Sequence, residues 1–471
     1  MNLTLFLPEI SLLLTIGLLL VLACRKPDAR RDYAAATAAA AAVVVFSLAG
    51  SPLSGTLFGG SYRIDLFSQV FKVFIASGFF LVVFLCSEFQ GISPDSRTEG
   101  YLLLAVSTLA MMLMTSAVHL VALFLALELS SYSLYLLVFI RRPSHWGLAC
   151  GLRFFIIGAS ISAVMLLGMA LLYSVTGTLA LDALVRQLPA LITRPIVAGS
   201  VLLVMAGFFF KLALFPFHTW APDTYEGAPN QVAAFVATVS KLAAIAVLLR
   251  IISLTQGSGD LLAKGLIALA IASMTVGNLA AIAQNDFKRL MAFSSIAHAG
   301  YLLIGILCMT PDSYRATMFY AVAVLTMKFT CFMVMIKVAA DGRNLQISEL
   351  AGLHRRSPLL ALALMMALFG LGGIPPTIGF TGKFLIFTAA IAKGYLALVI
   401  IAMVNVVISL YYYLLVLKAA YLDEPARAQA ELSVSYPDKI LAVAMISVMM
   451  VVGFYPNALL NLVQAAALNL P

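Results

Sequence analysis

Residues 370–383 read GLGGIPPTIGFTGK and interrupt an apolar stretch that runs from residue 357 to about residue 392. Pro375 and Pro376 lack the backbone donors of a continuous helix, and the glycines around them weaken the helix further. The charged Lys383 follows eight residues after Pro375. This pattern predicts a broken helix with a buried lysine beside the break.

A second apolar stretch is broken in the same way. Residues 211–218 read KLALFPFH, with Pro216 five residues after Lys211. Unwound backbone at membrane depth is tolerated only where protein buries it or where it lines a water-filled cavity. A single proline kink is often only structural, but paired breaks in the two halves of a chain are typical of a transport site. We therefore expect both segments to belong to such a site.

The composition indicates the class of protein. Of the 471 residues, 63% are hydrophobic and only 10% are charged. With a mean hydropathy of +1.04, the chain has too little polar surface to cover a soluble globule. Apolar runs repeatedly reach the roughly 20 residues that cross a bilayer, which predicts an all-α polytopic membrane protein. Fourteen candidate spans result, with the seventh and twelfth broken: 3–24, 33–50, 67–88, 100–116, 118–140, 150–174, 197–216, 232–252, 261–283, 289–309, 315–338, 357–392, 395–420 and 437–459.

Lysine and arginine are unevenly distributed over the predicted loops. Loops after odd-numbered spans hold sixteen of the 29 basic residues, whereas loops after even-numbered spans hold seven. Because positive charge accumulates on the cytoplasmic side, the odd loops are predicted to be cytoplasmic and both termini to face the opposite side. The formal net charge of +9 then reflects topology and contact with lipid headgroups. No basic domain indicates nucleic-acid binding.

Sequence motifs for cofactors are missing from the chain. The five cysteines are scattered, without the C-x-x-C spacing of a zinc site or the clustered thiols of an iron–sulfur centre. Neither a G-x-G-x-x-G fingerprint after a strand nor a Walker loop is present. We therefore predict that the chain itself holds no metal, redox cofactor or nucleotide, and that whatever drives it lies elsewhere.

Seven charged residues lie inside the apolar spans. A charge at the bilayer centre costs at least about 2.5 kcal/mol on insertion scales, so such residues are rare and usually mark an ion or proton path. They are Lys72, Arg153, Lys211, Lys241, Lys328, Lys383 and a single acid, Glu128.

An internal repeat is indicated by the two breaks, which lie five spans apart. Ser130-Ser131 in span five matches Ser294-Ser295 in span ten at an offset of 164 residues. A unit of five spans crosses the membrane an odd number of times, so its second copy inserts upside down. We predict that spans 4–8 and 9–13 are inverted repeats. The predicted segments are an N-terminal three-helix segment 1–99, a first repeat 100–252, a second repeat 261–420 and a C-terminal helix 421–471.

Five segments of the chain carry a family resemblance. They read LELSSYSLYLL at 127–137, KLALFPFHTWAPDTYEGAPN at 211–230, TVSKLAA at 238–244, QNDFKRLMAFSSIAHAGY at 284–301 and GGIPPTIGFTGKFLIF at 372–387. These motifs closely resemble the antiporter-like, Mrp-related, proton-translocating membrane subunits of NADH-quinone oxidoreductase (respiratory complex I), and among them subunit N. A lysine at 383, where subunit M has an acid, and a short C-terminus, where subunit L carries further helices, favour subunit N.

The resemblance implies a function and a setting. Such a subunit couples electron transfer from NADH to quinone, which occurs in partner subunits, to proton pumping across the bacterial cytoplasmic (inner) membrane. It belongs to a translocase but has no redox site of its own. Flavin, iron–sulfur clusters and quinone are expected only in partner subunits. Expected partners are a neighbouring antiporter-like subunit, small membrane subunits and lipids.

The resemblance also assigns residues by position. The embedded acid of span five and the lysines of the first break, of span eight and of the second break correspond to Glu128, Lys211, Lys241 and Lys383. The chain departs from the family where Arg153 replaces a common lysine, Lys328 replaces a neutral residue, and Asn230-Gln231 replaces a small residue or threonine followed by proline.

The chemistry of these side chains agrees with that assignment. A buried lysine that alternately has and lacks an acid partner takes up and releases a proton near neutral pH. We expect Glu128 and Lys211 to form that pair. Lys241, at the middle of an unbroken span, is the expected central carrier, and Lys383 is the expected exit group. His298 suits a relay because histidine titrates near neutral pH.

The two departures at charged positions lead to a separate expectation. Arg153 stays charged at accessible pH and cannot pass on a proton, whereas Lys328 adds a titratable amine. We expect Lys328 to lie between Lys241 and Lys383 and to supply a relay step.

Other interpretations of these patterns exist. Simpler roles concern single residues: snorkelling of Lys72, an interfacial Glu9, a structural His298, lipid pairing of Lys328, and turn contacts of His218, Asp223 and Glu226. The alternative function is a subunit of an Mrp-type cation/proton antiporter, or of a related ferredoxin- or deazaflavin-dependent complex. An independent solute carrier is disfavoured because no substrate-sized set of polar residues accompanies the breaks.

Overall fold

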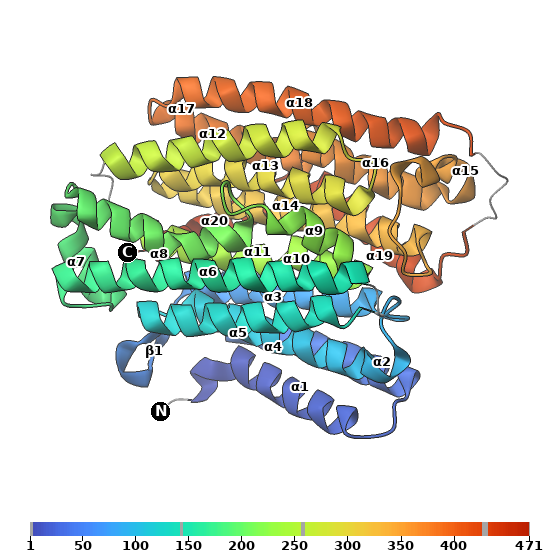
Figure 1. Ribbon diagram of the computed structural model, residues 1–471, viewed down its shortest axis with the longest axis horizontal. Helices are drawn as coiled ribbons and strands as arrows, with labels where there is room; N and C mark the ends of the chain where they lie inside the picture. Colours follow the sequence, from blue (N-terminus) through green and yellow to red (C-terminus); the bar gives the residue numbers. More distant parts are fainter. Residues whose placement is uncertain (1–2, 142–144, 256–259, 426–431, 471) are drawn as a thin grey trace. The chain divides into compact units, whose positions relative to one another are not determined.

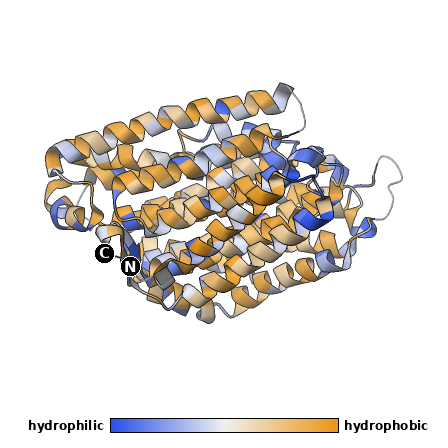
Figure 2. Ribbon diagram, turned by 90° about the horizontal axis from the view of Figure 1, so that it is seen from below, coloured by the Kyte–Doolittle hydropathy of each residue, from blue (hydrophilic) through white to orange (hydrophobic). Residues whose placement is uncertain are grey.

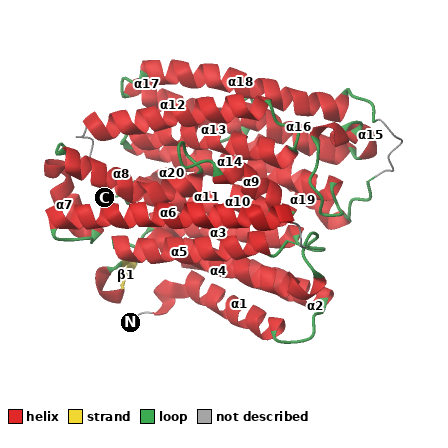
Figure 3. Cartoon of the chain, in the orientation of Figure 1, coloured by secondary structure: helices red, strands yellow, loops and turns green. Residues whose placement is uncertain are grey.

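A computed structural model describes residues 3–141, 145–255, 260–425 and 432–470, and these ranges are largely helical (Figure 3). Thirteen helices within them are long and apolar enough to cross a membrane. Two shorter apolar helices, Pro358–Gly372 and Ile378–Ala392, form the two halves of the predicted broken span twelve. The prediction of an all-α polytopic membrane protein with about fourteen spans is therefore confirmed.

The helices follow one another along the chain with short connections (Figure 1). The first eleven are α1 (Leu7–Ala23), α2 (Ala29–Gly50), α3 (Leu66–Leu85), α4 (Arg97–Ser116), α5 (Leu120–Phe139), α6 (His145–Thr176), α7 (Leu181–Leu191), α8 (Pro195–Leu212), α9 (Trp220–Gly227), α10 (Asn230–Ala237) and α11 (Val239–Ser253). The remaining nine are α12 (Asp260–Ile282), α13 (Phe287–Leu307), α14 (Pro311–Val338), α15 (Leu353–Arg356), α16 (Pro358–Gly372), α17 (Ile378–Ala392), α18 (Leu396–Tyr421), α19 (Tyr436–Phe454) and α20 (Asn457–Ala467).

A small hairpin precedes α3. Strands β1 (Gly55–Leu57) and β2 (Tyr62–Ile64) pair antiparallel, with Gly55 opposite Ile64. Directly after β2, the Asp65 side chain accepts a hydrogen bond from the backbone of Ser68 and the Ser68 hydroxyl reaches back, which forms a capping box. The hairpin and this cap together fix where α3 begins.

The chain divides into two compact units. The first unit comprises Met1–Leu212, Gly227–Leu266 and Val463–Pro471, and the second comprises Ala213–Glu226 and Ile267–Leu462. Hydrophobic residues predominate along the helices of both units, as the orange ribbons of Figure 2 show. This distribution is that of a protein whose helices face lipid as well as one another.

In the first unit, small residues allow two long helices to approach closely. A Cβ atom on Gly168 of α6 would lie 2.7 Å from the backbone nitrogen of Val204 on α8, closer than real Cβ atoms come. Helix α11 packs against α3, α4 and α8. The most apolar window of the segment Asn230–Ser253, which contains α10 and α11, is completely buried. Lys241 therefore lies on the most enclosed span of this unit.

In the second unit, α14 packs against α13, α16, α17 and α19. Gly379 of α17 lies so close to the carbonyl oxygen of Gly370 on α16 that no side chain would fit between them. Helix α16 ends with Gly373 in the left-handed conformation, at a φ of 81°, which glycine adopts without strain. The glycines of the predicted break thus both end one half-helix and let the next approach it.

Both predicted breaks are present, and one further break was not expected. Helix α8 ends at Leu212 and α16 ends at Gly372. Span eight, expected to be unbroken, is interrupted at Thr238, whose φ of −119° and ψ of −77° separate α10 from α11. The Thr238 hydroxyl donates to the carbonyl of Ala234, so a local side-chain bond competes with the helical pattern there.

Candidate functional site

Serine hydroxyls surround the first two residues of the predicted path. Glu128, on α5, is half-buried and its Oε1 accepts a hydrogen bond from the hydroxyl of Ser162 on α6. Lys211, in the last turn of α8, is buried and donates to the Ser130 hydroxyl at 3.2 Å. Ser130 in turn lies 3.2 Å from the hydroxyl of Ser107 on α4. Lys211 thus donates its hydrogen bond to serine and not to Glu128, although the Glu128 charge acts on it electrostatically.

Lys241 reaches the end of the helix that carries Lys211. Its Nζ atom donates to the carbonyl oxygen of Leu212 at 3.2 Å, and its residue is only 6% exposed. Leu212 is the last residue of α8, so its carbonyl has no partner in a next helical turn. The break after Leu212 therefore creates an acceptor for Lys241 one residue away from Lys211. The acceptor of Lys241 and Lys211 itself are therefore adjacent residues of α8, and their membership of one proton path stays a prediction.

In the second unit, Lys328 and His298 belong to one hydrogen-bonded cluster. Lys328 is fully buried, and its Nζ donates to the Met291 carbonyl at 2.8 Å and to the Ser294 hydroxyl at 3.0 Å. Ser294 lies 2.6 Å from the hydroxyl of Tyr413. His298 Nε2 lies 3.1 Å from the same tyrosine hydroxyl. The lipid-facing alternative for Lys328 is wrong, because its ammonium faces polar groups inside the unit.

The same set of side chains continues towards Lys383. The rings of Tyr413 and Tyr412 lie 4.4 Å apart, and the Tyr412 hydroxyl donates to Asn278 at 3.0 Å. Asn278 donates to the Tyr301 hydroxyl at 3.3 Å. Lys383 lies over the Tyr301 ring at 4.9 Å. Its Nζ donates to the carbonyl of Leu371 at 2.7 Å, next to the break at the end of α16. Polar side chains therefore run from Lys328 to Lys383 within the second unit.

Arg153 differs from the other members of the predicted set. It lies on the exposed face of α6, and its guanidinium is 5.7 Å from the centre of the Trp146 ring. Only 28% of the most apolar window of this helix is buried within the chain. Arg153 is exposed, in contrast to the buried lysines of the two clusters.

Two residues that sequence analysis assigned to the membrane interface are instead buried and paired. Glu9 and Lys72 are both fully buried, and Lys72 Nζ lies 2.7 Å from Glu9 Oε1. The Tyr62 hydroxyl donates to the same oxygen at 2.5 Å. The expectations of a snorkelling Lys72 and an interfacial Glu9 are therefore wrong. A buried charge needs a partner, and each of these two residues provides it for the other.

Arg250, near the end of predicted span eight, is also buried. Its guanidinium holds Asp65 with two hydrogen bonds, of 3.0 and 3.1 Å. A third bond of 3.2 Å reaches the Thr115 carbonyl at the end of α4. This bidentate pair ties the end of α11 to the start of α3.

The acids after the first break bind an arginine. Arg289, in the first turn of α13, donates to Asp223 at 3.0 Å and to Glu226 at 2.8 Å. Asp286 caps the same helix by accepting a hydrogen bond from the Arg289 backbone, and burial raises the pKa of this carboxyl. The expected turn contacts of Asp223 and Glu226 are thus specific ion pairs within the second unit.

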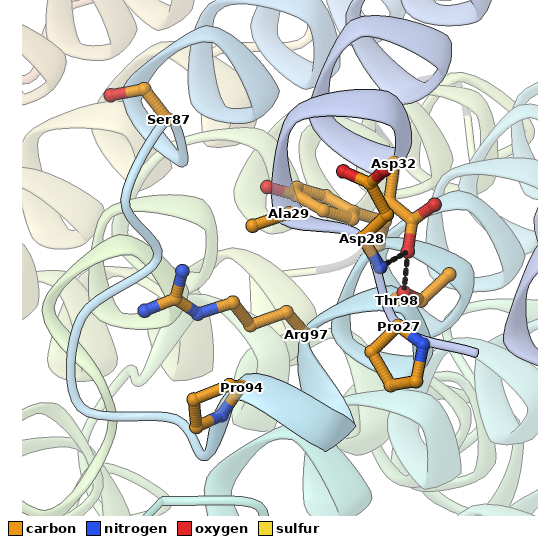
Figure 4. A pocket seen from close by; sticks show the side chains of 9 residues that line it. Pro27, Asp28, Ala29, Asp32, Ser87, Pro94, Arg97 and Thr98 are labelled. Atoms are coloured by element: carbon orange, nitrogen blue, oxygen red, sulfur yellow. Dashed lines mark hydrogen bonds between the residues drawn. The ribbon is translucent and has the colours of Figure 1, made fainter.

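A small cavity of the first unit contains none of the predicted residues. Figure 4 shows Asp32 joined to Thr98 and to the Asp28 backbone, with Arg97 beside them. The cavity has a volume of about 10 Å³, which is too small for a solute. Within the described ranges, no three histidine, cysteine or acidic side chains gather closely enough to hold a metal ion. The buried lysine clusters are therefore the candidate site.

Comparison with known proteins gives a consistent family. Residues 117–409 match the family described as NADH:quinone oxidoreductase/Mrp antiporter, TM. The chain is 53% identical to NADH-quinone oxidoreductase subunit N 2 of Syntrophobacter fumaroxidans over 99% of both chains. It is 37% identical to subunit N of Desulfovibrio desulfuricans over 96% of this chain and 94% of that protein.

A solved structure agrees with these relatives. A chain of respiratory complex I from Thermus thermophilus superimposes with a TM-score of 0.84 at 32% identity, over 96% of this chain and 98% of that one. Because the family match, the relatives over the whole chain and the solved structure all agree, the chain belongs to the subunit N family of NADH-quinone oxidoreductase, within the antiporter-like membrane subunits.

Proposed function

We propose that this chain is a proton-translocating membrane subunit of NADH-quinone oxidoreductase. Electron transfer from NADH to quinone in partner subunits drives protons through its buried glutamate and lysines. The main support for the proposal is a set of four buried lysines, each of which donates a hydrogen bond to a hydroxyl group or to a carbonyl at a helix break. They form two clusters, Lys211 with Lys241 and Lys328 with Lys383. Family membership supplies the coupling to quinone reduction.

In the first cluster, the geometry suits a switched proton carrier. Lys211 and Lys241 meet at the C-terminal end of α8, where the free carbonyls favour positive charge. A charge change at Glu128 then decides whether Lys211 keeps its proton. Serine hydroxyls both donate and accept, and they can carry a proton between these groups.

In the second cluster, hydroxyl and imidazole groups separate the two lysines. Ser294 and Tyr413 can each accept a proton while donating another, and His298 lies between two tyrosine hydroxyls, those of Tyr413 and Tyr320. A proton released by Lys328 can therefore be relayed by reorientation of these groups and of water towards Lys383. That Lys328 lies between Lys241 and Lys383 on one path stays a prediction.

The setting of the chain belongs to the same proposal. We place it in the bacterial cytoplasmic (inner) membrane with both termini on the non-cytoplasmic side, as the distribution of basic residues predicts. Its partners are a neighbouring antiporter-like subunit, small membrane subunits and lipids. Flavin, iron–sulfur clusters and quinone reside in partner subunits.

One alternative keeps the fold but changes the assembly. A chain of the Mrp complex from Dietzia superimposes with a TM-score of 0.86 at 21% identity, over 100% of this chain and 98% of that one, which shows a shared fold. A cation/proton antiporter subunit would use buried lysines similarly, but without a redox partner. The 53% identity over the whole chain to a subunit N protein favours the redox complex.

Purification of the intact assembly separates these functions. An affinity tag on this chain should retrieve a particle that contains flavin and iron–sulfur clusters, oxidises NADH with quinone and acidifies one side of reconstituted liposomes. A particle without flavin or iron–sulfur clusters that exchanges sodium for protons would contradict the proposal and support the antiporter.

A further inference from the structure

A second group of buried polar residues lies in the three N-terminal helices, and the proposed proton path does not use it. These residues are Glu9 on α1, Ser47 on α2, and Gln69 and Lys72 on α3, and each is 0% exposed. Three of them also have one polar atom without a hydrogen-bond partner in the described part of the chain: Glu9 Oε2, Ser47 Oγ and Gln69 Oε1. Buried polar atoms of this kind are usually satisfied by internal water.

In the ion pair at the centre of the group, only one of the two carboxylate oxygens of Glu9 has partners. Glu9 Oε1 receives both the Lys72 ammonium, at 2.7 Å, and the Tyr62 hydroxyl, at 2.5 Å. Oε2 of the same carboxylate receives neither. A buried ion pair is most stable when hydrogen bonds satisfy all its oxygens and protons. The free oxygen and the remaining ammonium protons therefore point to a further ligand.

The other polar atoms approach the same place from α2 and α3. A Cβ atom on Gly50 would lie 3.3 Å from the Pro8 side chain and 3.8 Å from the Gln69 amide nitrogen. Gln69 Nε2 donates to the Gly50 carbonyl at 2.9 Å, which leaves its oxygen free. Ser47 lies one turn earlier on the buried face of α2. Helix α2 therefore packs against the Pro8 side chain of α1 and against Gln69 of α3, and all three helices carry a buried polar atom without a partner among the described residues.

The charged neighbours decide which groups can titrate. Asp65 and Arg250 act on Lys72 electrostatically but neutralise each other in a bidentate pair. Burial raises the pKa of Tyr62 well above its ordinary value, so the phenol keeps its proton. Glu9 and Lys72 are left as the ion pair at the centre of the group.

We propose that these residues form a hydrated proton-binding site, whose ligands are internal water and one proton. In its resting state the site holds a Glu9 carboxylate and a Lys72 ammonium, with no net charge. Uptake of one proton by Glu9 Oε2, delivered as a hydrated proton from the aqueous phase through the site water, gives a neutral acid beside the ammonium, and release returns that proton to the aqueous phase by the same route. Tyr62 lies in the hairpin that precedes α3, and its hydroxyl donates to Glu9, so it links the site to the end of α3 where that helix begins.

Infrared difference spectroscopy on the intact complex tests this site without relying on pumping. Stepping the pH should produce a carboxylic-acid C=O band that is lost in Glu9→Gln. Asp32→Asn is the matched control, because Asp32 is a buried carboxylate of the same unit whose oxygens are bound by Thr98 and Arg31. Gln69→Leu removes a water partner but keeps the ion pair, so it should shift the band. An unchanged spectrum in both Glu9→Gln and Gln69→Leu would overturn the proposal.

A pumping measurement separates a proton site from a static ion pair. The double variant Glu9→Gln, Lys72→Met leaves no buried charge unpaired, so a merely structural pair predicts normal pumping after assembly. The proposed site predicts fewer protons moved per NADH oxidised, and normal pumping in the double variant would contradict it. Lys241→Ala is measured in parallel: if that variant pumps normally, the proposed function fails, while the Glu9 band remains a separate result.

Discussion

At the scale of single residues, the path depends on lysines that are buried but never left without polar partners. Lys211 bonds a serine, whereas Lys241 and Lys383 each bond a carbonyl at the end of a broken helix. Lys328 bonds both kinds of acceptor. Carbonyl and hydroxyl acceptors stabilise an ammonium without holding it as firmly as a carboxylate would. Such lysines can lose a proton, which a lysine in a tight ion pair does less readily.

The first residue-scale prediction concerns the coupling of Glu128 and Lys211. Glu128→Gln and Lys211→Met should each slow NADH-driven quinone reduction, because each removes one charge of an interacting pair. The double variant should lose less than the sum of the single effects, with a coupling of about 1 kcal/mol. A double-mutant cycle on turnover rates measures this. Strict additivity would mean that the two side chains act independently.

The second prediction concerns Lys328. Because its ammonium bonds Ser294 inside the second cluster, Lys328→Met should slow coupled turnover while leaving the complex assembled. Thr330→Val on the same helix is the control, since its hydroxyl bonds only within α14 at Thr326. Arg153→Lys in the Lys328→Met background should partly restore turnover. Proton pumping by Lys328→Met equal to that of the control would rule out a relay at this position.

At the scale of elements, the breaks in α8 and α16 were predictable because proline and glycine mark them. The interruption at Thr238 was not, since no proline or glycine stands there and only a threonine hydroxyl competes with the helix. The N-terminal ion pair was also missed. Apolar periodicity places Glu9 and Lys72 in two different spans, and only the packing of α1 near α3 shows that they meet.

An element-scale prediction concerns two tyrosines of α18. Tyr413 is buried and joins Ser294 to His298 through its hydroxyl, whereas Tyr411 is 55% exposed on the same helix. Tyr413→Phe keeps the ring and removes the link, so it should slow coupled turnover severalfold without preventing assembly. Tyr411→Phe, the matched control, should behave as the unmodified complex. Equal activity of the two variants would show that the hydroxyl chain carries no protons.

At the scale of the whole molecule, composition and hydropathy were enough for the fold class and for about fourteen spans, whereas the family was indicated by the resemblance of five sequence motifs. Length and hydropathy determine how many helices cross a membrane, and the charged residues inside them are few enough to recognise. The partners of those charges could not be predicted, because they come from helices distant in sequence. Tyr413 and Asn278, which complete the second cluster, look like ordinary residues of apolar spans until the helices are packed.

The central claim is that buried lysines carry protons through this chain, and Lys241→Ala tests it most directly. Lys241 bonds the last carbonyl of α8 from the most enclosed span of the first unit. Ser240→Ala, beside it on α11, serves as the control. In liposomes that contain the purified complex, the account predicts that Lys241→Ala assembles but loses the NADH-driven pH gradient, while Ser240→Ala retains it. A normal gradient with Lys241→Ala would contradict the account.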